Sequence, residues 1–113
     1  AGLVGLILAA SARRIPVVLD GLITGAAALI AVALEPTAQR VLIAGTRSSE
    51  PAHGAILDAL KLQPLLDLGI RLGEGAAAAL AIPLVRASCR TMAEMCTFEE
   101  AGIPEPMDLV GRQ

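Results

Sequence analysis

The run Ile15-Pro16-Val17-Val18-Leu19 is followed by Asp20-Gly21 and then by an uncharged segment, Leu22 to Leu34. A short β-branched run of this kind is typical of a strand buried on both faces, and Pro16 stands at its start, where its missing N–H does least harm. The uncharged segment after the Asp-Gly turn has the length and composition of a helix. Together the three pieces predict a βα unit.

The same order of elements recurs further along the chain. Glu35-Pro36 ends the helix, residues 40–44 supply a second short apolar run, and Gly45 opens into the polar stretch 46–51. Two strands separated by a helix imply a parallel pair with a right-handed crossover. We therefore predict an α/β fold, a Rossmann-like parallel sheet portion with helices packed on it, followed by a C-terminal helical segment. The expected strands are 15–19 and 40–44, and the expected helices are 2–12, 22–34, 52–61 and 76–94.

The chain is expected to fall into three parts. Residues 1–75 form the C-terminal part of an α/β domain, residues 76–102 form the helical segment, and residues 103–113 form a flexible tail. Pro83 is expected to kink or break the long helix, and Thr97 to Glu100 has the pattern of a capping box. Apolar residues predict a buried stripe on that helix: Leu80, Leu84, Val85, Ala87, Cys89, Met92 and Met95.

The composition argues against two classes of protein. The 113 residues are 55% hydrophobic and only 1% aromatic, with a mean hydropathy of +0.68, so we expect one core and apolar surface that another segment or subunit covers. A net charge of −2 and the scarcity of aromatic rings argue against a nucleic-acid surface. The longest uncharged run, 21–34, is shorter than the roughly 20 residues that span a bilayer.

The cysteines and the histidine form no recognisable site. Cys89 and Cys96 are the only cysteines, and His53 is the only histidine. Because this set gives neither a zinc pattern nor a disulfide framework, we expect no metal and no cofactor. We expect reduced, buried thiols in a cytoplasmic protein. His53 stands alone and is interpreted as a helix-surface residue, not as a ligand or base.

Two candidate site segments follow the two predicted strands. In parallel sheets ligands bind at the carboxyl ends of the strands, which here are Asp20-Gly21 and 45–49. Asp20 could contribute to a site or could cap the helix that follows it. Ser48 and Ser49 could bind a phosphate through backbone N–H groups, or could be ordinary turn residues.

A third candidate segment precedes the long helix and reads Leu65-Leu66-Asp67-Leu68-Gly69-Ile70-Arg71-Leu72-Gly73-Glu74-Gly75. Glycines allow close approach of the backbone to a ligand, and a helix start offers free N–H groups. Glu74 would be presented there beside a bound molecule, or it could simply complement the helix dipole. Arg71 could clamp an anion or pair with Asp67, one helical turn away.

Three motifs of this chain resemble, in their order and spacing, the nicotinate-nucleotide–dimethylbenzimidazole phosphoribosyltransferase family. They are residues 14–21, Arg47-Ser48-Ser49-Glu50-Pro51, and residues 65–75 with their Gly-Glu-Gly ending. Residues 95–102 resemble the family's C-terminal Met-x-Thr-Phe-x-x-Ala-Gly segment. The resemblance covers nearly the whole chain up to Gly102 but only the C-terminal part of the family, so we expect a fragment that is inactive alone.

What the resemblance implies is a glycosyl transfer. The family moves the ribose phosphate of nicotinate mononucleotide onto 5,6-dimethylbenzimidazole, which gives nicotinate and the α-ribazole phosphate of the cobalamin lower ligand. Glu74 occupies the position of the family's general base, a role that suits a carboxylate in an apolar, water-poor pocket. The resemblance also implies a homodimer, and the composition and the short apolar runs predict no nucleic-acid or membrane partner. The implied substrate-binding residues are Ser48, Arg71, Leu72, Gly73 and Asp20.

The chain also departs from the family pattern. Ala76 stands where the family often has Ser or Thr, Thr46 where it often has His, and Ala52 where it has Gly. The family's glycine-rich phosphate site and most of its benzimidazole pocket are expected upstream of Ala1. The alternatives are a non-catalytic α/β structural or interaction module and a membrane-associated helical piece, which the short apolar runs disfavour.

Overall fold

The computed structural model describes residues 1–69, 71 and 73–103. In this part of the chain two parallel strands, β1 (Val17–Leu19) and β2 (Leu42–Ala44), pair in a register that sets Val18 opposite Ile43. The ladder continues past the strand ends, because Gly45 N–H donates to the Leu19 carbonyl at 2.9 Å. The predicted parallel pair is confirmed.

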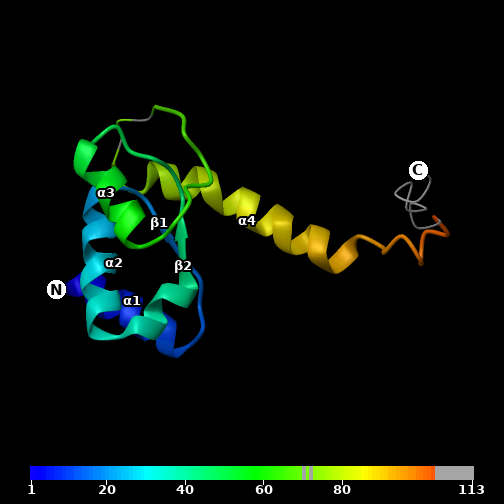
Figure 1. Ribbon diagram of the computed structural model, residues 1–113, viewed down its shortest axis with the longest axis horizontal. Coiled ribbons are helices and arrows are strands. Elements are labelled where there is room, and N and C mark those ends of the chain that lie inside the picture. Colours follow the sequence, from blue (N-terminus) through cyan, green and yellow to red (C-terminus); the bar gives the residue numbers. More distant parts are fainter. Residues whose placement is uncertain (70, 72, 104–113) are drawn as a thin grey trace, which may run out of the picture.

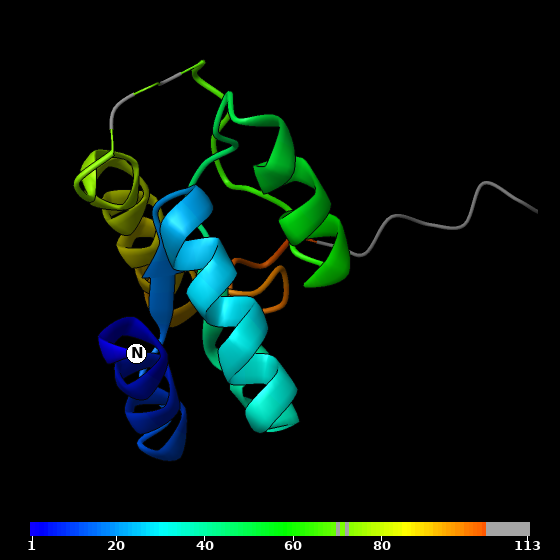
Figure 2. The same cartoon turned by 90° about the vertical axis from the view of Figure 1, so that its left-hand side faces the viewer.

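The helical elements are, in chain order, α1 (Gly2–Ala12), α2 (Leu22–Leu34), the 3₁₀ segment η1 (Pro36–Val41), α3 (Pro51–Ala59) and α4 (Ala76–Glu94). Figures 1 and 2 show α1 and α2 side by side on one face of the strands, with the first turns of α4 on the other face. α3 packs against α2. This arrangement confirms the predicted α/β class.

The main core lies between α1, α2, η1 and the strands, and small side chains dominate it. Ala28, Ala31 and Ala38 are fully buried. Their small side chains let the helices approach closely. On the opposite face Gly45 allows a similar approach: a Cβ there would lie 2.8 Å from the Leu19 carbonyl oxygen and 3.3 Å from the Ala81 Cβ. The buried members of the main core are Ile7, Leu19, Ala27, Ala28, Ala31, Ala38, Leu42 and Leu60.

The predicted ranges of α1, α2 and α4 agree with the structure, whereas both strands are shorter than predicted. Residues 15–16 lie outside β1 because α1 ends in a Schellman motif: Arg14 has a φ of 56°, and Ile15 N–H donates to the Ala10 carbonyl at 2.9 Å. α3 begins at Pro51, since proline fits the first helical position, and ends at Ala59.

The start of the second predicted strand was also wrong, since residues 40 and 41 belong to η1. The Glu35 carboxylate accepts hydrogen bonds from the Thr37 N–H at 3.1 Å and the Thr37 hydroxyl at 2.9 Å. This cap, with Pro36 at the first position, starts a 3₁₀ segment that continues to Val41.

Beyond its first turns α4 extends away from the rest of the molecule (Figure 1). Ala77 and Ala81 are its only buried residues among those described. The predicted buried stripe is therefore wrong: Leu80 is 50% exposed and Met92 is 87% exposed. Cys89 and Cys96 are exposed as well, which corrects the prediction of buried thiols.

Two local predictions on the C-terminal side have different outcomes. Pro83 lies inside α4 without breaking it, and its exposed position leaves water access to the carbonyl that loses its N–H partner. The Thr97–Glu100 capping box is confirmed, because Thr97 N–H donates to Glu100 at 2.8 Å and Glu100 N–H donates to Thr97 at 3.2 Å. Residues 104–113 of the predicted tail lie outside the described residues.

No helix in the described part of the chain combines the length and the apolar character that a membrane crossing requires.

Candidate functional site

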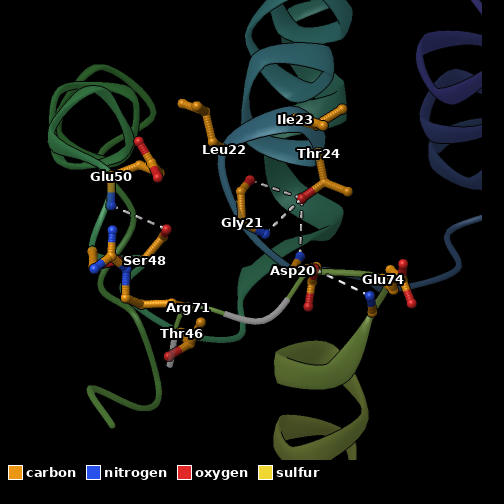
Figure 3. Close-up of a pocket in the computed structure, with 13 residues that line it drawn as sticks. Asp20, Gly21, Leu22, Ile23, Thr24, Thr46, Ser48, Glu50, Arg71 and Glu74 are labelled. Carbon is orange, nitrogen blue, oxygen red and sulfur yellow. Dashed lines mark hydrogen bonds between the residues drawn. The ribbon is translucent and has the colours of Figure 1, made fainter. Parts of the chain in front are cut away.

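A cleft of about 480 Å³ opens at the carboxyl ends of the two strands. Its walls come from the β1–α2 turn, the loop after β2 and the turn before α4. Figure 3 shows Ser48 and Glu50 at one end of the cleft and Glu74 at the other, with Asp20 and Gly21 between them. The lining residues are Asp20, Gly21, Leu22, Ile23, Thr24, Thr46, Ser48, Ser49, Glu50, Arg71, Gly73, Glu74 and Gly75.

Glu74 stands in a tight turn with an unusual backbone. Glu74 has a φ of 63° and Gly75 a φ of 85°, and Ala76 N–H donates to the Gly73 carbonyl at 3.3 Å. These are the φ angles of a type I′ turn, whose first central position favours Asn, Asp or Gly. A glutamate held in the left-handed region is strained, and strain of this kind clusters at functional sites.

Asp20 holds this turn from the end of β1. Its Oδ1 accepts hydrogen bonds from Ala77 N–H at 2.9 Å and Ala78 N–H at 3.1 Å, and its Oδ2 accepts one from Gly75 N–H at 3.2 Å. Asp20 therefore caps α4, which starts 56 residues further along the chain (Figure 3).

This cap rules out one of the two alternatives for Asp20, that it caps the helix that follows it. The first turn of α2 is closed instead by Thr24, whose Oγ1 accepts from Asp20 N–H and Gly21 N–H, both at 3.0 Å. The free N–H groups that the start of α4 was expected to offer to a ligand are also largely taken, because Asp20 binds three of them. The negative charge at the start of α4 therefore comes from the Asp20 side chain and not from a bound ligand.

Ser48 lies half-buried in the loop after β2 and is fixed through both its backbone and its side chain. Its N–H donates to Nδ1 of His53 at 3.0 Å, and its Oγ accepts from Glu50 N–H at 3.2 Å. The Ser48 N–H is therefore not free for a phosphate. The hydroxyl hydrogen of Ser48 can still donate to an oxygen of a bound molecule.

Asp67 pairs with Arg47 and not with Arg71, so one of the two alternatives for Arg71 is wrong. Arg47 forms the ion pair with Asp67, at 3.6 Å between Nε and Oδ2, and both side chains are largely exposed. Arg71 lines the cleft instead, as does Gly73. Leu72, the remaining predicted contact residue, lies outside the described residues.

His53 is buried, with 1% of its surface exposed, and so the prediction of a surface position was wrong. Burial and the positive charge of Arg47 lower its pKa below the ordinary value of 6.5, while Asp20 acts in the opposite direction. The signal for burial was present: Ile56, Leu57 and Leu60 follow at intervals of three, four and seven residues and place His53 on the apolar face of α3.

Residues 1–69, 71 and 73–103 contain no group of three or more His, Cys, Asp or Glu side chains placed to hold a metal ion. The polar groups that the cleft does present are hydroxyls, carboxylates and one guanidinium. Such groups can bind an anionic sugar phosphate and can accept a proton, which are the tasks of a group-transfer site.

Comparison with known proteins identifies the family. The sequence profile of a phosphoribosyltransferase family matches residues 1–103. The nicotinate-nucleotide–dimethylbenzimidazole phosphoribosyltransferase of Chloroflexus aggregans is 58% identical over 104 residues, which are 92% of this chain and 30% of that protein. The enzyme of the same name from Halalkalibacterium halodurans is 47% identical over 113 residues, 100% of this chain and 32% of the relative.

The chain belongs to the nicotinate-nucleotide–dimethylbenzimidazole phosphoribosyltransferase family. A crystal structure of the Thermus thermophilus member has the same fold, with a TM-score of 0.87 at 44% identity over 92% of this chain and 31% of that one. The family membership predicted from the three motifs is confirmed. The chain spans about 30% of the length of the relatives that it matches.

Proposed function

We propose that the full-length protein containing this chain transfers the ribose phosphate of nicotinate mononucleotide to 5,6-dimethylbenzimidazole, with Glu74 as the general base. The observation that carries the proposal is the placement of Glu74 in a strained turn at the rim of the cleft, at the opposite end from Ser48. A mononucleotide has its phosphate and its base at opposite ends. The cleft offers the Ser48 hydroxyl, beside Glu50, at one end and the Glu74 carboxylate at the other.

The chemistry asks little of the chain beyond positioning and one proton transfer. One benzimidazole nitrogen attacks the anomeric carbon of the nucleotide, and the bond from that carbon to the nicotinate nitrogen breaks, its electron pair leaving with nicotinate. The proton on the other benzimidazole nitrogen passes to the Glu74 carboxylate. A base held within reach of that nitrogen accelerates the attack by stabilising the positive charge that develops on the ring.

Each of the other cleft residues has a proposed task. The Ser48 hydroxyl donates to an oxygen of the mononucleotide, and Arg71 and Gly73 form the wall beside the benzimidazole, together with Leu72. Asp20 lines the cleft, where it could contact substrate, and it also positions Glu74 through the turn that it caps.

Glu74 is exposed in the described chain, so these residues alone do not supply the water-poor pocket that was expected around it. Exposed apolar side chains lie nearby on α2, including Ile23 at 75% exposure. We propose that other parts of the full-length protein cover this face and exclude water from the carboxylate. The homodimeric state, the cytoplasmic location and the position of this segment within the full-length relatives remain predictions.

The test is Glu74→Gln in the full-length protein, because glutamine keeps the shape and hydrogen-bonding reach of glutamate but cannot take the proton. We expect kcat to fall by roughly 10²–10⁴-fold, the usual contribution of a positioned general base, with KM for either substrate little changed. Steady-state kinetics with both substrates measures this. An unchanged kcat with intact binding would make Glu74 a helix-start carboxylate, and no turnover by the unmodified protein would favour the non-catalytic module.

A further inference from the structure

The loop that carries Ser48 is held from inside the protein by one buried side chain. Ser48 N–H donates to Nδ1 of His53 over 3.0 Å, and His53 lies in the first turn of α3 with 1% of its surface exposed. The ring does not line the cleft, so it cannot touch a molecule bound there. Its effect on the cleft must pass through Ser48.

The direction of this hydrogen bond fixes the protonation state of the ring. A backbone N–H can only donate, so Nδ1 of His53 must carry a lone pair and no hydrogen. The ring is then neutral, with its hydrogen on Nε2. Protonation at Nδ1 would replace the acceptor by a second donor facing the Ser48 N–H, and the contact would be lost.

The packing around the ring leaves it little room to turn. A Cβ at Gly25 of α2 would lie 3.4 Å from Cδ2 and 3.6 Å from Nε2 of His53, and 2.9 Å from Cγ2 of Ile56. Glycine at position 25 therefore lets the imidazole and Ile56 pack directly on the backbone of α2. Because α2 begins at the β1–α2 turn, the ring links the two walls of the cleft.

The charged groups around the ring favour the neutral form. Arg47, in the same loop as Ser48, repels a positive charge on His53, and burial acts in the same direction, so both lower its pKa. Asp20, from the end of β1, acts oppositely but is already bound to three N–H groups at the start of α4. On α2, Gly25 lies against the ring, and the helix Leu22–Leu34 carries no charged side chain.

We infer that neutral His53 is a positioning residue, which fixes Ser48 for the mononucleotide through its Nδ1 acceptor and releases the loop when it is protonated. The inference rests on the proposed function for the identity of the bound molecule. The hydrogen bond between Ser48 and His53 is a feature of the loop whatever molecule binds there.

The test compares two variants in the full-length protein. His53→Asn keeps an acceptor oxygen close to the position of Nδ1 and does not titrate, whereas His53→Leu keeps apolar volume and offers no acceptor. We expect His53→Leu to raise KM for nicotinate mononucleotide about 10-fold with kcat little changed, and His53→Asn to recover most of that loss. Equal KM values in both variants would overturn the inference, because a purely structural histidine would not distinguish them.

The pH profile gives a second readout. In the unmodified protein, KM for nicotinate mononucleotide should rise as the pH falls from 6.5 through the lowered pKa of His53. In His53→Asn this rise should disappear. An unaltered acid limb in His53→Asn would assign the titration to another group and overturn the inference.

Amide hydrogen exchange of residues 46–50 separates this inference from the proposed function, since it needs no substrate. At the same pH, exchange of this loop should be faster in His53→Leu than in His53→Asn. If the protein does not use nicotinate mononucleotide but this difference is found, the positioning role stands and the proposed substrate falls. If turnover is normal and exchange is identical in the two variants, the positioning role falls and the proposed reaction stands.

Discussion

The two ends of the cleft are built in opposite ways. At the Ser48 end the loop is tied to a buried histidine and to Glu50, and Thr46 beside it is 3% exposed, with its hydroxyl donating to the Leu66 carbonyl at 3.0 Å. At the Glu74 end the turn is exposed, and two successive residues have positive φ angles. There the carboxylate of Asp20 accepts the hydrogen bonds that tie the turn and the start of α4 to the end of β1.

This difference indicates that the Ser48 end serves binding and the Glu74 end serves the chemical step. A loop tied to buried side chains suits the binding of a group that stays in place, because preorganised contacts lose little entropy when the ligand binds. A strained turn suits a residue that takes part in the chemistry, because strain is tolerated where function requires that residue. Each end can therefore be altered separately by substitution.

The largest loss of stability is expected from Asp20→Ala, which removes the contact that holds the Glu74 end. Three backbone N–H groups lose a charged acceptor, so the free energy of unfolding should fall by about 1–3 kcal/mol. Activity should fall as well, because the turn that carries Glu74 is no longer fixed to β1. Denaturant unfolding and kcat of the full-length protein measure the two effects.

Asp20→Asn is the matched control. Asparagine keeps one acceptor oxygen for Ala77 N–H and Ala78 N–H. Its NH₂ group cannot accept the hydrogen bond from Gly75 N–H. Its losses of stability and activity should lie between those of Asp20→Ala and the unmodified protein. A stable Asp20→Ala variant with normal kcat would show that the cap of α4 does not position Glu74.

A smaller and more selective effect is expected from Ser48→Asp at the other end. The new carboxylate repels the phosphate of nicotinate mononucleotide, and two like charges about 4 Å apart near a protein surface cost enough to weaken binding by about 10- to 100-fold. Binding of 5,6-dimethylbenzimidazole should change little. Calorimetric titration with each ligand checks this, with Ser48→Asn as the uncharged control of similar shape. Equal losses for both ligands would indicate a folding defect.

The smallest expected change in stability is a gain from Glu74→Gly. Glycine occupies the left-handed region without the cost of a Cβ, which outweighs its greater entropy in the unfolded chain and should raise the free energy of unfolding by about 0.5–1 kcal/mol. Activity should fall as in Glu74→Gln. Glutamine keeps the Cβ and should leave stability unchanged in thermal unfolding. If Glu74→Gly is less stable than the unmodified protein, the positive φ of Glu74 does not strain the turn.

Local pattern was sufficient for much of the fold. Three helices follow from local composition: the uncharged runs 2–12 and 22–34, and the segment with the alanine-rich start of α4. Their ends depend on neighbouring residues and were predicted correctly. The strand boundaries were not, because Arg14 adopts a positive φ that only the folded chain shows, and because the Glu35 cap favours a 3₁₀ segment over an early strand.

The sequence pointed to residues that line one cleft, but it did not reveal the contacts that hold them in place. The strand-end rule and the three motifs brought Asp20, Ser48, Arg71, Gly73 and Glu74 to attention, and these residues do line one cleft. The cap of α4 by Asp20 joins residues 55 to 58 positions apart, which no local spacing reveals. The role of His53 was missed because a single histidine was judged by its isolation and not by the apolar face that it shares.

The long separation between Asp20 and α4 also bears on the order in which the protein folds. Closing a loop of this length is entropically costly, so the contact forms only after the intervening elements have shortened the effective distance. A nascent chain that has completed β1 through α3 would already contain the Ser48 loop, with its histidine contact, while the carboxylate end was still unplaced. We therefore expect the ability to hold a nucleotide to arise earlier in folding than the ability to react with it, so that the reactive end is assembled last.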